Sequence, residues 1–453
     1  MKAEISPLDG RYYRRIGHLS DYFSEFALAR ARCWMELKHI EALDETGLFT
    51  SLTQKEKQRL KKAKKTFTED DFARIKEIED RVNQDVKSCE LFLRESLQLE
   101  NPNLIHFGLT SEDVNNLAYN RLFDAFRTEQ QLPLLKQLIE KLAEMVDKWR
   151  AVPFPARTHG QAASPTTAGK ELAVFLTRLL RQYSALRQFR FRGKLNGATG
   201  NYSALLAAFP KHDWIAFSRQ FVEGLEFDAN PCTTQIEDHD AWSAYFSLTK
   251  RINCIVLDLD RDLWAYTSRG WFRLKPQTDE VSSSTMPHKV SPINFENSEG
   301  NLILSNALLA TLADDLTQSR MQRDLSDSTM TRNVGVALAH AYLAITETLE
   351  GLGKLSLDEE AIRCDLEAAP EVLAEAYQTI LRTTDVEDPY ELLKEQTRGR
   401  KVSLEDLHRF VDDIEVADSV KTRLKALRVR DYVGDAAKIC GLVVEEARKE
   451  LGE

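Results

Sequence analysis

The sequence is poor in cysteine and contains no long uninterrupted apolar run. Its six cysteines are spread along 453 residues, at positions 33, 89, 232, 254, 364 and 440. No pair has the spacing of a metal site or belongs to a disulfide framework, so we expect reduced, buried thiols. No stretch approaches the roughly 18 consecutive apolar residues of a membrane-spanning helix. The opening MKAEISPLDGRYYRR has no apolar segment typical of a signal peptide. These absences indicate a cytoplasmic protein with no membrane partner.

The sequence also lacks an excess of positive charge. Its formal net charge is -10 at pH 7, whereas general nucleic-acid binding relies on a basic surface. We therefore expect no nucleic-acid partner. A small anionic substrate remains compatible with this charge if a few basic residues are concentrated in one place. The histidines show no metal-ligand spacing, so we expect neither a metal nor another cofactor.

Helical periodicity is the strongest pattern that is present. One apolar stripe with helical spacing consists of Leu135, Leu138, Ile139, Leu142, Val146 and Trp149. The segments 172–183, 242–270, 301–318 and 334–352 also read as helices, and 301–316 is apolar on more than one face. Such helices suit the middle of a bundle or a subunit interface. We predict an all-α fold with long central helices and no large sheet.

The chain is longer than a single hydrophobic core usually serves, so several domains are expected. Shorter helices, separated by loop-like stretches such as DETGLFTS and QLENPN, predict an N-terminal helical domain over 1–110. The long helices predict a central bundle domain over 111–362. A more charged and variable end, broken by DPYELLKEQTRGRKVS, predicts a small helical domain over 363–453.

The stretch from Ser282 to Asn301 places hydroxyl and cationic side chains directly before a predicted helix. Ser291 followed by Pro292 has the form of an N-cap and a first helical residue. The positive helix end, together with Lys289 and a protonated His288, would favour the alkoxide form of a nearby serine, which could then act as a base. The alternative is an ordinary N-cap with a solvated serine-rich turn.

Two further stretches carry side chains suited to chemistry. His159, in ARTHGQAASP, has the usual side chain for proton transfer near neutral pH, although a lone histidine in a loop can be incidental. QRDLSDSTMTRN holds Arg323, Ser328 and Arg332, a combination that can bind phosphate or carboxylate. Its alternative is a solvated helix face. NGATGNY fits neither a dinucleotide fingerprint nor a phosphate-binding loop, and we interpret it as a tight turn.

Taken together, these stretches are more specific than any of them alone. SSSTMPHKVSPINFE is similar to the signature loop of the fumarase/aspartase superfamily. Within it the chain resembles the adenylosuccinate lyase family, through SPLDGRY, NQDVKS, LTSEDVNN, RTHGQ, TTQIE, the loop and RDLSDSTMTRN. These motifs extend from residue 6 to residue 333 in the order of the family. The end of the chain after about residue 360 carries less specific signal.

The resemblance implies a reaction, an architecture and an assembly. The implied reaction is β-elimination of fumarate from adenylosuccinate, giving AMP, and from the purine precursor SAICAR, giving AICAR, in purine nucleotide biosynthesis. The implied fold has three helical domains. Its central bundle is shared in a homotetramer, and each active site combines stretches from three subunits. Large apolar helix faces are consistent with such an assembly, because a monomer would expose them.

The resemblance also assigns roles to individual residues. It implies that Ser283 is the general base and His159 the general acid, with Glu296 orienting the histidine. Lys289 would act in catalysis and, with Asn297, hold the succinyl carboxylates. The positions that it implies for substrate binding are Arg11, Tyr12, Asn83, Gln84, Asp85, Thr110, Ser111, Gln235, Lys289, Asn297, Arg323, Ser328 and Arg332. The first two and the last three of these would bind the phosphate end.

The sequence departs from the family pattern at three positions in two of these stretches. The family usually has glycine at the position of Ser282, asparagine at that of Ser291 and, in many members, histidine at that of Gln84. Serine is also a good N-cap, so we expect the helix start to survive at Ser291. Glutamine forms hydrogen bonds but does not relay a proton, so more of the acid role falls on His159.

Three alternatives remain at this point. Another superfamily lyase, such as an argininosuccinate lyase, uses a similar loop on a different leaving group. The arginine-rich stretch and the SPLDGRY start favour a phosphorylated substrate instead. A non-catalytic structural relative would not require Ser283, His159, Lys289 and Glu296 together. A general helical interaction protein explains none of the motifs.

Overall fold

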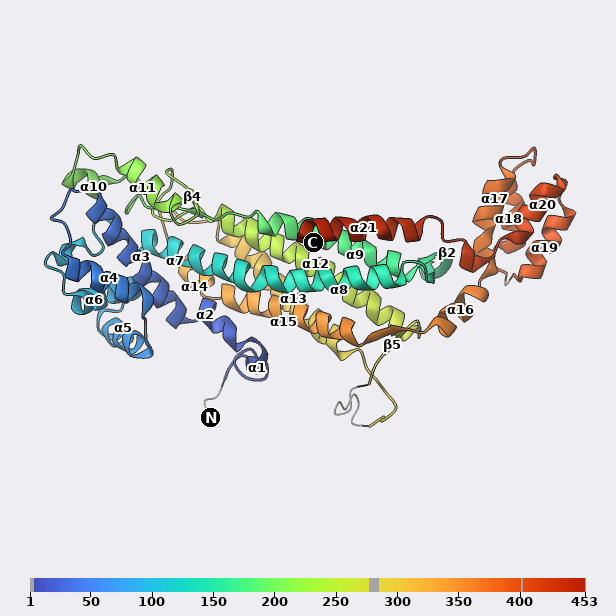
Figure 1. The fold of residues 1–453 in the computed structure, drawn as a ribbon, viewed down its shortest axis with the longest axis horizontal. Coiled ribbons are helices and arrows are strands. Elements are labelled where there is room, and N and C mark those ends of the chain that lie inside the picture. Colours follow the sequence, from blue (N-terminus) through green and yellow to red (C-terminus); the bar gives the residue numbers. More distant parts are fainter. Residues whose placement is uncertain (1–3, 277–284, 401, 453) are drawn as a thin grey trace. The chain divides into compact units, whose positions relative to one another are not determined.

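The computed structural model describes residues 4–276, 285–400 and 402–452. Helices dominate, and the described strands form small two-stranded sheets, so the predicted all-α fold is confirmed (Figure 1). No helix in these ranges is long and apolar enough to cross a membrane. The chain separates into two compact units. The first comprises Met1–Leu134, Ala185–Cys254 and Gly300–Ala344, and the second comprises Leu135–Ser184, Ile255–Glu299 and Ile345–Glu453.

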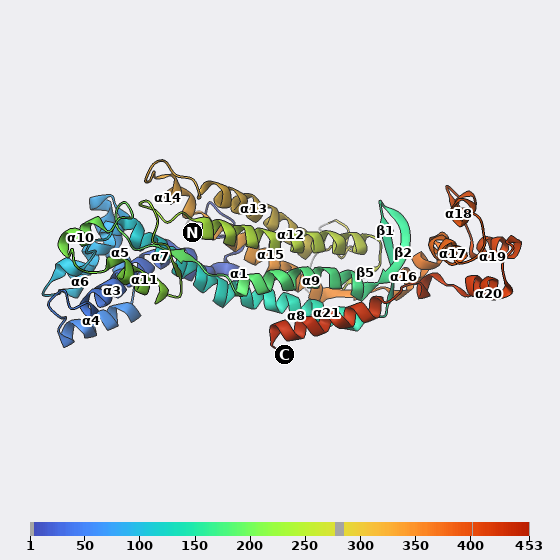
Figure 2. The same ribbon diagram turned by 90° about the horizontal axis from the view of Figure 1, so that it is seen from above.

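The first unit begins with a group of helices, of which those between residues 25 and 97 share one apolar core (Figures 1 and 2). They are α1 (Tyr13–Ile16), α2 (Ser20–Phe23), α3 (Glu25–Glu45), α4 (Gln54–Lys65), α5 (Glu69–Val82), α6 (Asp85–Leu97) and α7 (Ser111–Phe126). The helix α3 packs against α4, α5, α6 and α7. Reciprocal capping boxes fix the starts of α4, by Thr53 and Glu56, and of α5, by Thr68 and Asp71.

Shorter elements complete the first unit. They are the helices α10 (Ser203–Ala208), α11 (Trp214–Glu223) and α14 (Ser326–Thr331), and the parallel strands β3 (Arg192–Gly193) and β4 (Asp228–Ala229). The stretch NGATGNY is a turn, as predicted, because Gly197 and Gly200 both have positive φ (85° and 77°).

The long helices agree with the predicted periodicity, with ends that differ by a few residues. They are α8 (Leu132–Trp149), α9 (Ala168–Arg187), α12 (Asp240–Ser268), α13 (Ile293–Asp315) and α15 (Val334–Lys354). The helix α13 begins one residue later than the predicted Pro292, whose carbonyl accepts from Glu296 N at 3.3 Å. A start at this proline suits its missing N–H, because the first N–H groups of a helix have no partner within it.

Buried polar pairs lie between these helices, where the sequence predicted apolar faces. In the first unit, His340 Nδ1 lies 2.7 Å from Asn301 Oδ1, and Asn253 Nδ2 donates to Ser305 Oγ at 3.0 Å. In the second unit, Thr348 Oγ1 donates to the buried Asp260 carboxylate at 2.9 Å. Such pairs fix which turns of neighbouring helices face each other, because a mismatch leaves a buried polar group without a partner.

The second unit contains two antiparallel pairs of strands and the C-terminal helices. The strands β1 (Pro153–Thr158) and β2 (Gln161–Thr167) form a hairpin (Figure 2). The strand β5 (Phe272–Leu274) pairs with β6 (Leu355–Leu357). Phe154 anchors the hairpin on Tyr266, Trp271 and Phe272. The remaining helices are α16 (Glu359–Glu367), α17 (Ala374–Leu381), α18 (Pro389–Thr397), α19 (Leu404–Asp413), α20 (Asp418–Ala426) and α21 (Ala436–Leu451).

Candidate active site

The start of α6 carries three of the predicted substrate-binding residues. Asn83 ends α5 in a left-handed conformation (φ 51°) and is exposed. Gln84 is the N-cap of α6, where its side chain accepts from Lys87 N. Asp85 is the first residue of the helix, and its Oδ1 accepts from Val86 N at 2.9 Å. The capping geometry therefore explains why these side chains emerge together at one helix end.

The start of α7 lies beside it. Gln84 Nε2 donates to Ser111 Oγ at 3.0 Å, which joins two predicted substrate-binding positions. Thr110 precedes α7 as its N-cap, and its N–H donates to Asp113 Oδ2 at 2.8 Å. The N-termini of α6 and α7 thus face one region, and the positive ends of the two helices favour an anionic ligand there.

A fully buried ion pair fixes the start of α7. Lys194 Nζ lies 3.2 Å from Asp113 Oδ1, and both side chains are 0% exposed. Lys194 Nζ also donates to the carbonyl of Gln235 at 2.5 Å. The Gln235 side chain in turn donates to Ala198 O at 3.1 Å. Lys194 and Asp113, which the sequence analysis did not single out, therefore hold Gln235 and the start of α7 in one arrangement.

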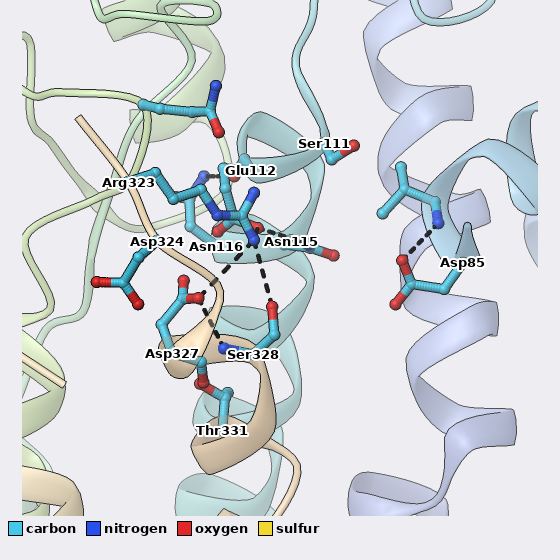
Figure 3. Close-up of polar contacts among 12 residues, drawn as sticks. Asp85, Ser111, Glu112, Asn115, Asn116, Arg323, Asp324, Asp327, Ser328 and Thr331 are labelled. Atoms are coloured by element: carbon cyan, nitrogen blue, oxygen red, sulfur yellow. Dashed lines mark hydrogen bonds and ion pairs between the residues drawn. The ribbon is translucent and has the colours of Figure 1, made fainter. Parts of the chain in front are cut away.

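Arg323 and Ser328 come together beside the first turn of α7, as Figure 3 shows. Arg323 NH2 donates to Ser328 Oγ at 3.2 Å and lies 3.0 Å from the buried Glu112 carboxylate. Arg323 Nε is buried and has no hydrogen-bond partner among the described residues. Because buried polar groups are normally paired, this N–H is available to an anionic ligand.

Arg332 is the third member of the cluster and the most exposed. Its NH2 lies 3.2 Å from Asp85 Oδ2, and half of its side chain (50%) is exposed. The same Asp85 oxygen accepts from Arg32 NH2 at 2.7 Å. Burial alone would raise the pKa of Asp85, but the Arg32 guanidinium and, more weakly, Arg332 hold it below its usual value. Arg32, Asp85, Arg332 and Tyr119 line a cavity of about 210 Å³.

His159 lies at the tip of the β1–β2 hairpin, in the second unit. Thr158 pairs with Gln161, so His159 and Gly160 form a two-residue turn, and both have positive φ (52° and 75°). This is the geometry of a type I′ turn, in which glycine is favoured. The histidine side chain is exposed, so its ring is not enclosed by its own chain.

The start of α13 carries the other predicted residues of the second unit. Lys289 is exposed in the turn before the helix. Glu296 Oε1 accepts from Trp264 Nε1 at 3.0 Å, and within the described residues no hydrogen bond joins Glu296 to His159. Asn297 Nδ2 donates to Glu347 Oε1 at 2.9 Å. The buried Glu347 also accepts from Asn294 Nδ2 at 2.6 Å, so it clamps the first turn of α13.

The remaining predicted positions lie before α1 or outside the described residues. Ser282 and Ser283, the predicted base, lie outside the described residues. Arg11 is exposed in the turn before α1, and Tyr12 N donates to Pro7 O at 2.9 Å. The described residues contain no group of three metal-ligating side chains arranged to hold an ion.

Two family descriptions match successive parts of the chain. A family described as lyase matches residues 10–308, and one described as adenylosuccinate lyase C-terminal matches residues 319–433. An adenylosuccinate lyase of Escherichia coli is 43% identical over 452 residues, covering 95% of this chain and 96% of its own. One of Haemophilus influenzae is 42% identical, with 96% of this chain and 97% of its own covered.

Solved structures agree on the fold. A fumarate lyase from Mesorhizobium sp. superposes with a TM-score of 0.79 at 17% identity, covering 95% of this chain and 97% of its own. A 3-carboxy-cis,cis-muconate lactonizing enzyme from Pseudomonas putida superposes with a TM-score of 0.77 at 18% identity, covering 98% of this chain and 100% of its own. The chain therefore shares its helical architecture with these two proteins.

Proposed function

The chain belongs to the adenylosuccinate lyase family, and from that premise we propose that it eliminates fumarate from adenylosuccinate to give AMP. The observation that carries the proposal is the arginine cluster. Arg323 and Arg332 approach one region with Ser328, and the buried Arg323 Nε lacks a partner among the described residues. A phosphate group would supply acceptors for these donors. The same chemistry makes SAICAR, with the same succinyl and phosphate ends, the second proposed substrate, giving AICAR.

The elimination needs a base and an acid on two faces of the substrate. In our proposal Ser283 removes a proton from the succinyl carbon beside a carboxylate. The electron pair left on that carbon forms the double bond of fumarate while the C–N bond breaks. His159 then protonates the leaving nitrogen, for which an exposed imidazole on a rigid turn is well suited.

The start of α13 is proposed to hold the succinyl end. Lys289 is an exposed ammonium before this helix, and Asn297 presents an amide fixed by Glu347. Negative charge that develops on the substrate carboxylate during proton removal would be stabilised by both groups. Glu296 is proposed to orient His159, and the Trp264 hydrogen bond would then hold the carboxylate in place.

We further propose that the active site is completed in a homotetramer. Exposed apolar side chains support an interface on the long helices, because Ile303 (48%) and Leu304 (54%) of α13 face solvent. In the second unit, the exposed His159 and the Glu296 turn of α13 share no hydrogen bond within the described residues. A neighbouring copy would supply the missing partner. The division into domains at 1–110, 111–362 and 363–453, and a cytoplasmic location, stay predictions.

A direct assay tests the reaction. Purified protein is mixed with adenylosuccinate, SAICAR or argininosuccinate in separate reactions, without added metal or cofactor, and fumarate release is followed. We expect release from the first two substrates only. Release from argininosuccinate alone would favour the other superfamily lyase. No release from any of them would contradict an elimination of this kind and favour a non-catalytic relative.

A further inference from the structure

Arg32 is a buried cation behind the arginine cluster. It belongs to α3 and is only 6% exposed, among buried apolar neighbours such as Leu28, Ala29 and Met35. Its Nε donates to Asn115 Oδ1 at 2.9 Å and its NH2 to Asp85 Oδ2 at 2.7 Å. Desolvating a guanidinium is costly unless its donors are paired, so these two contacts are what make Arg32 tolerable at this position.

Asp85 is shared by two arginines of very different mobility. Both Arg32 and Arg332 reach the same oxygen, Oδ2, at 2.7 and 3.2 Å. The Arg32 side chain is 7% exposed, whereas that of Arg332 is 50% exposed. Only Arg332 can therefore turn toward a ligand entering the cavity, while Arg32 stays with the carboxylate.

This arrangement addresses a cost that phosphate binding would otherwise incur. When Arg332 leaves Asp85 for a phosphate, the partly buried carboxylate loses one cationic partner and also faces an incoming anion. An unpaired carboxylate at such a site would have to be desolvated alone, repel the phosphate or take up a proton. Arg32 remains beside Asp85 and removes that requirement.

We propose that Arg32 is a positioning residue that keeps Asp85 ionised, so that Arg332 can leave for the substrate phosphate without Asp85 taking up a proton. This inference rests on the proposed function. Arg32 is also connected to Arg323 through side-chain contacts. Asn115 Nδ2 donates to Glu112 Oε1 at 2.6 Å, and the same oxygen lies 3.0 Å from Arg323 NH2. Arg32 is thus linked through one carboxylate to each of the two phosphate-facing arginines.

The charged and titratable groups around Asp85 determine how its pKa should change when Arg32 is replaced. Those that share its charged surroundings or line the same cavity are Arg32, Lys76, Arg332, Glu25, Glu79, Glu112, Tyr22, Tyr119 and Cys89. Without Arg32, burial would still raise the pKa of Asp85, and Arg332 alone would oppose it. Asp85 would then compete with the phosphate for Arg332 whenever it is ionised.

The test compares KM for adenylosuccinate between pH 5.5 and pH 8.5 in the wild-type protein and in Arg32→Met. Dividing the variant KM by the wild-type KM at each pH removes the titration of the substrate itself. We expect this ratio to rise with pH, to about 10-fold or more at pH 8.5, because Asp85 is then ionised and retains Arg332. We expect kcat to change much less than KM.

Three further variants separate this role from a structural one. In Arg32→Met combined with Asp85→Asn the ratio should no longer depend on pH, because no carboxyl group remains to titrate. Arg32→Lys keeps a positive charge and should give a flat ratio; if Arg32→Met does not fold, Arg32→Gln, which removes the charge but keeps a polar side chain, takes its place. Arg190→Met, which breaks the exposed pair with Asp228, should leave KM unchanged at every pH.

The possible outcomes are distinguishable. A pH-independent ratio in Arg32→Met, a slope that persists in the double variant, or a slope in Arg32→Lys would each overturn the role of Arg32. Those results require a wild-type protein that releases fumarate. If the wild type releases none, the proposed function itself fails, whereas normal wild-type turnover with a flat Arg32→Met ratio overturns only this inference.

Discussion

At the scale of the residue, Glu237 is a buried carboxyl whose surroundings favour its neutral form. Burial and the nearby Asp238 raise its pKa to about 7, against the hydrogen bonds from Asn230 Nδ2 and His239 N, both at 2.9 Å. In an unfolded chain the pKa is about 4.3. The folded state therefore binds a proton that the unfolded state has lost between these two values.

This shift predicts a pH-dependent stability. The contribution of Glu237 is complete below the unfolded pKa and is lost as pH rises through the folded pKa of about 7. Relative to Glu237→Gln, the wild type should lose about 2–3 kcal/mol between pH 4.5 and pH 8. Thermal midpoints of both proteins at the two pH values measure it. Glu95→Gln is the control: Arg74 lowers the pKa of Glu95, so folded and unfolded states have both lost its proton above the unfolded value and its difference from wild type should hardly change between the two pH values. An unchanged difference between wild type and Glu237→Gln would contradict the prediction.

The proposed acid and base give a second prediction at this scale. Ser283→Ala and His159→Gln should each lower the turnover of adenylosuccinate by about two to four orders of magnitude, because each removes one proton-transfer group. His159 is exposed at a hairpin tip, so its variant should keep the wild-type thermal midpoint and particle size. Fumarate release measures the turnover, a thermal melt measures the midpoint, and light scattering measures the particle size. Near-normal turnover in either variant would show that its residue has been misassigned.

At the scale of the element, α13 and α15 touch through a glycine. A Cβ on Gly351 would lie 2.6 Å from Phe295 Cε1 and 3.2 Å from Asn294 Cβ. Both neighbours belong to the first turn of α13, beside Glu296 and Asn297. The small residue in α15 therefore determines how closely that turn, with its proposed catalytic side chains, can approach.

This contact predicts opposite effects for two glycines in one helix. Gly351→Ala should destabilise the protein by about 1–3 kcal/mol, because overpacking outweighs the roughly 1 kcal/mol gain in helix propensity. It should also lower turnover by displacing the start of α13. Gly353→Ala is the matched control, because no described atom lies within 4 Å of a Cβ there, so it should leave the thermal midpoint unchanged or raise it. Equal midpoints for the two variants would contradict the close-approach argument.

The elements also show which parts of the fold sequence reasoning reached. The helices α8, α9, α12 and α15 were predictable because apolar spacing along a helix is local information. The hairpin β1–β2 was not predicted. Its strands contain Pro153, Pro155 and Pro165 and lack a regular alternation, so only the exposed His-Gly turn marks it.

The candidate site divides in the same way. Ser328 was found from the chemistry of its own stretch and Asn297 through the resemblance, whereas Arg32, Lys194 and Glu347 were not found. Their partners lie far along the chain, as for Arg32 with Asp85, 53 residues away, and with Asn115, 83 residues away. A buried charge is recognised only when its counterpart is known, and that requires the tertiary structure.

At the scale of the whole molecule, the proposed tetramer predicts complementation between two inactive proteins. Ser283→Ala and His159→Gln chains, mixed under conditions that allow subunits to exchange, should form some sites with an intact serine and an intact histidine. Fumarate release should return to about a quarter of the wild-type rate if the two residues come from different subunits. Each variant alone, treated in the same way, is the control. No recovery despite proven exchange would place both residues of a site in one chain.

The turn that carries His159 limits which residues can replace the histidine during evolution. A replacement must suit a left-handed backbone before its chemistry matters, and branched residues such as valine are poorly tolerated there (His159 φ is 52°). Asparagine accepts this backbone readily but does not transfer a proton at neutral pH. Relatives that have lost catalysis should therefore carry asparagine or glycine at this turn. Either residue at this position would indicate a relative without lyase activity.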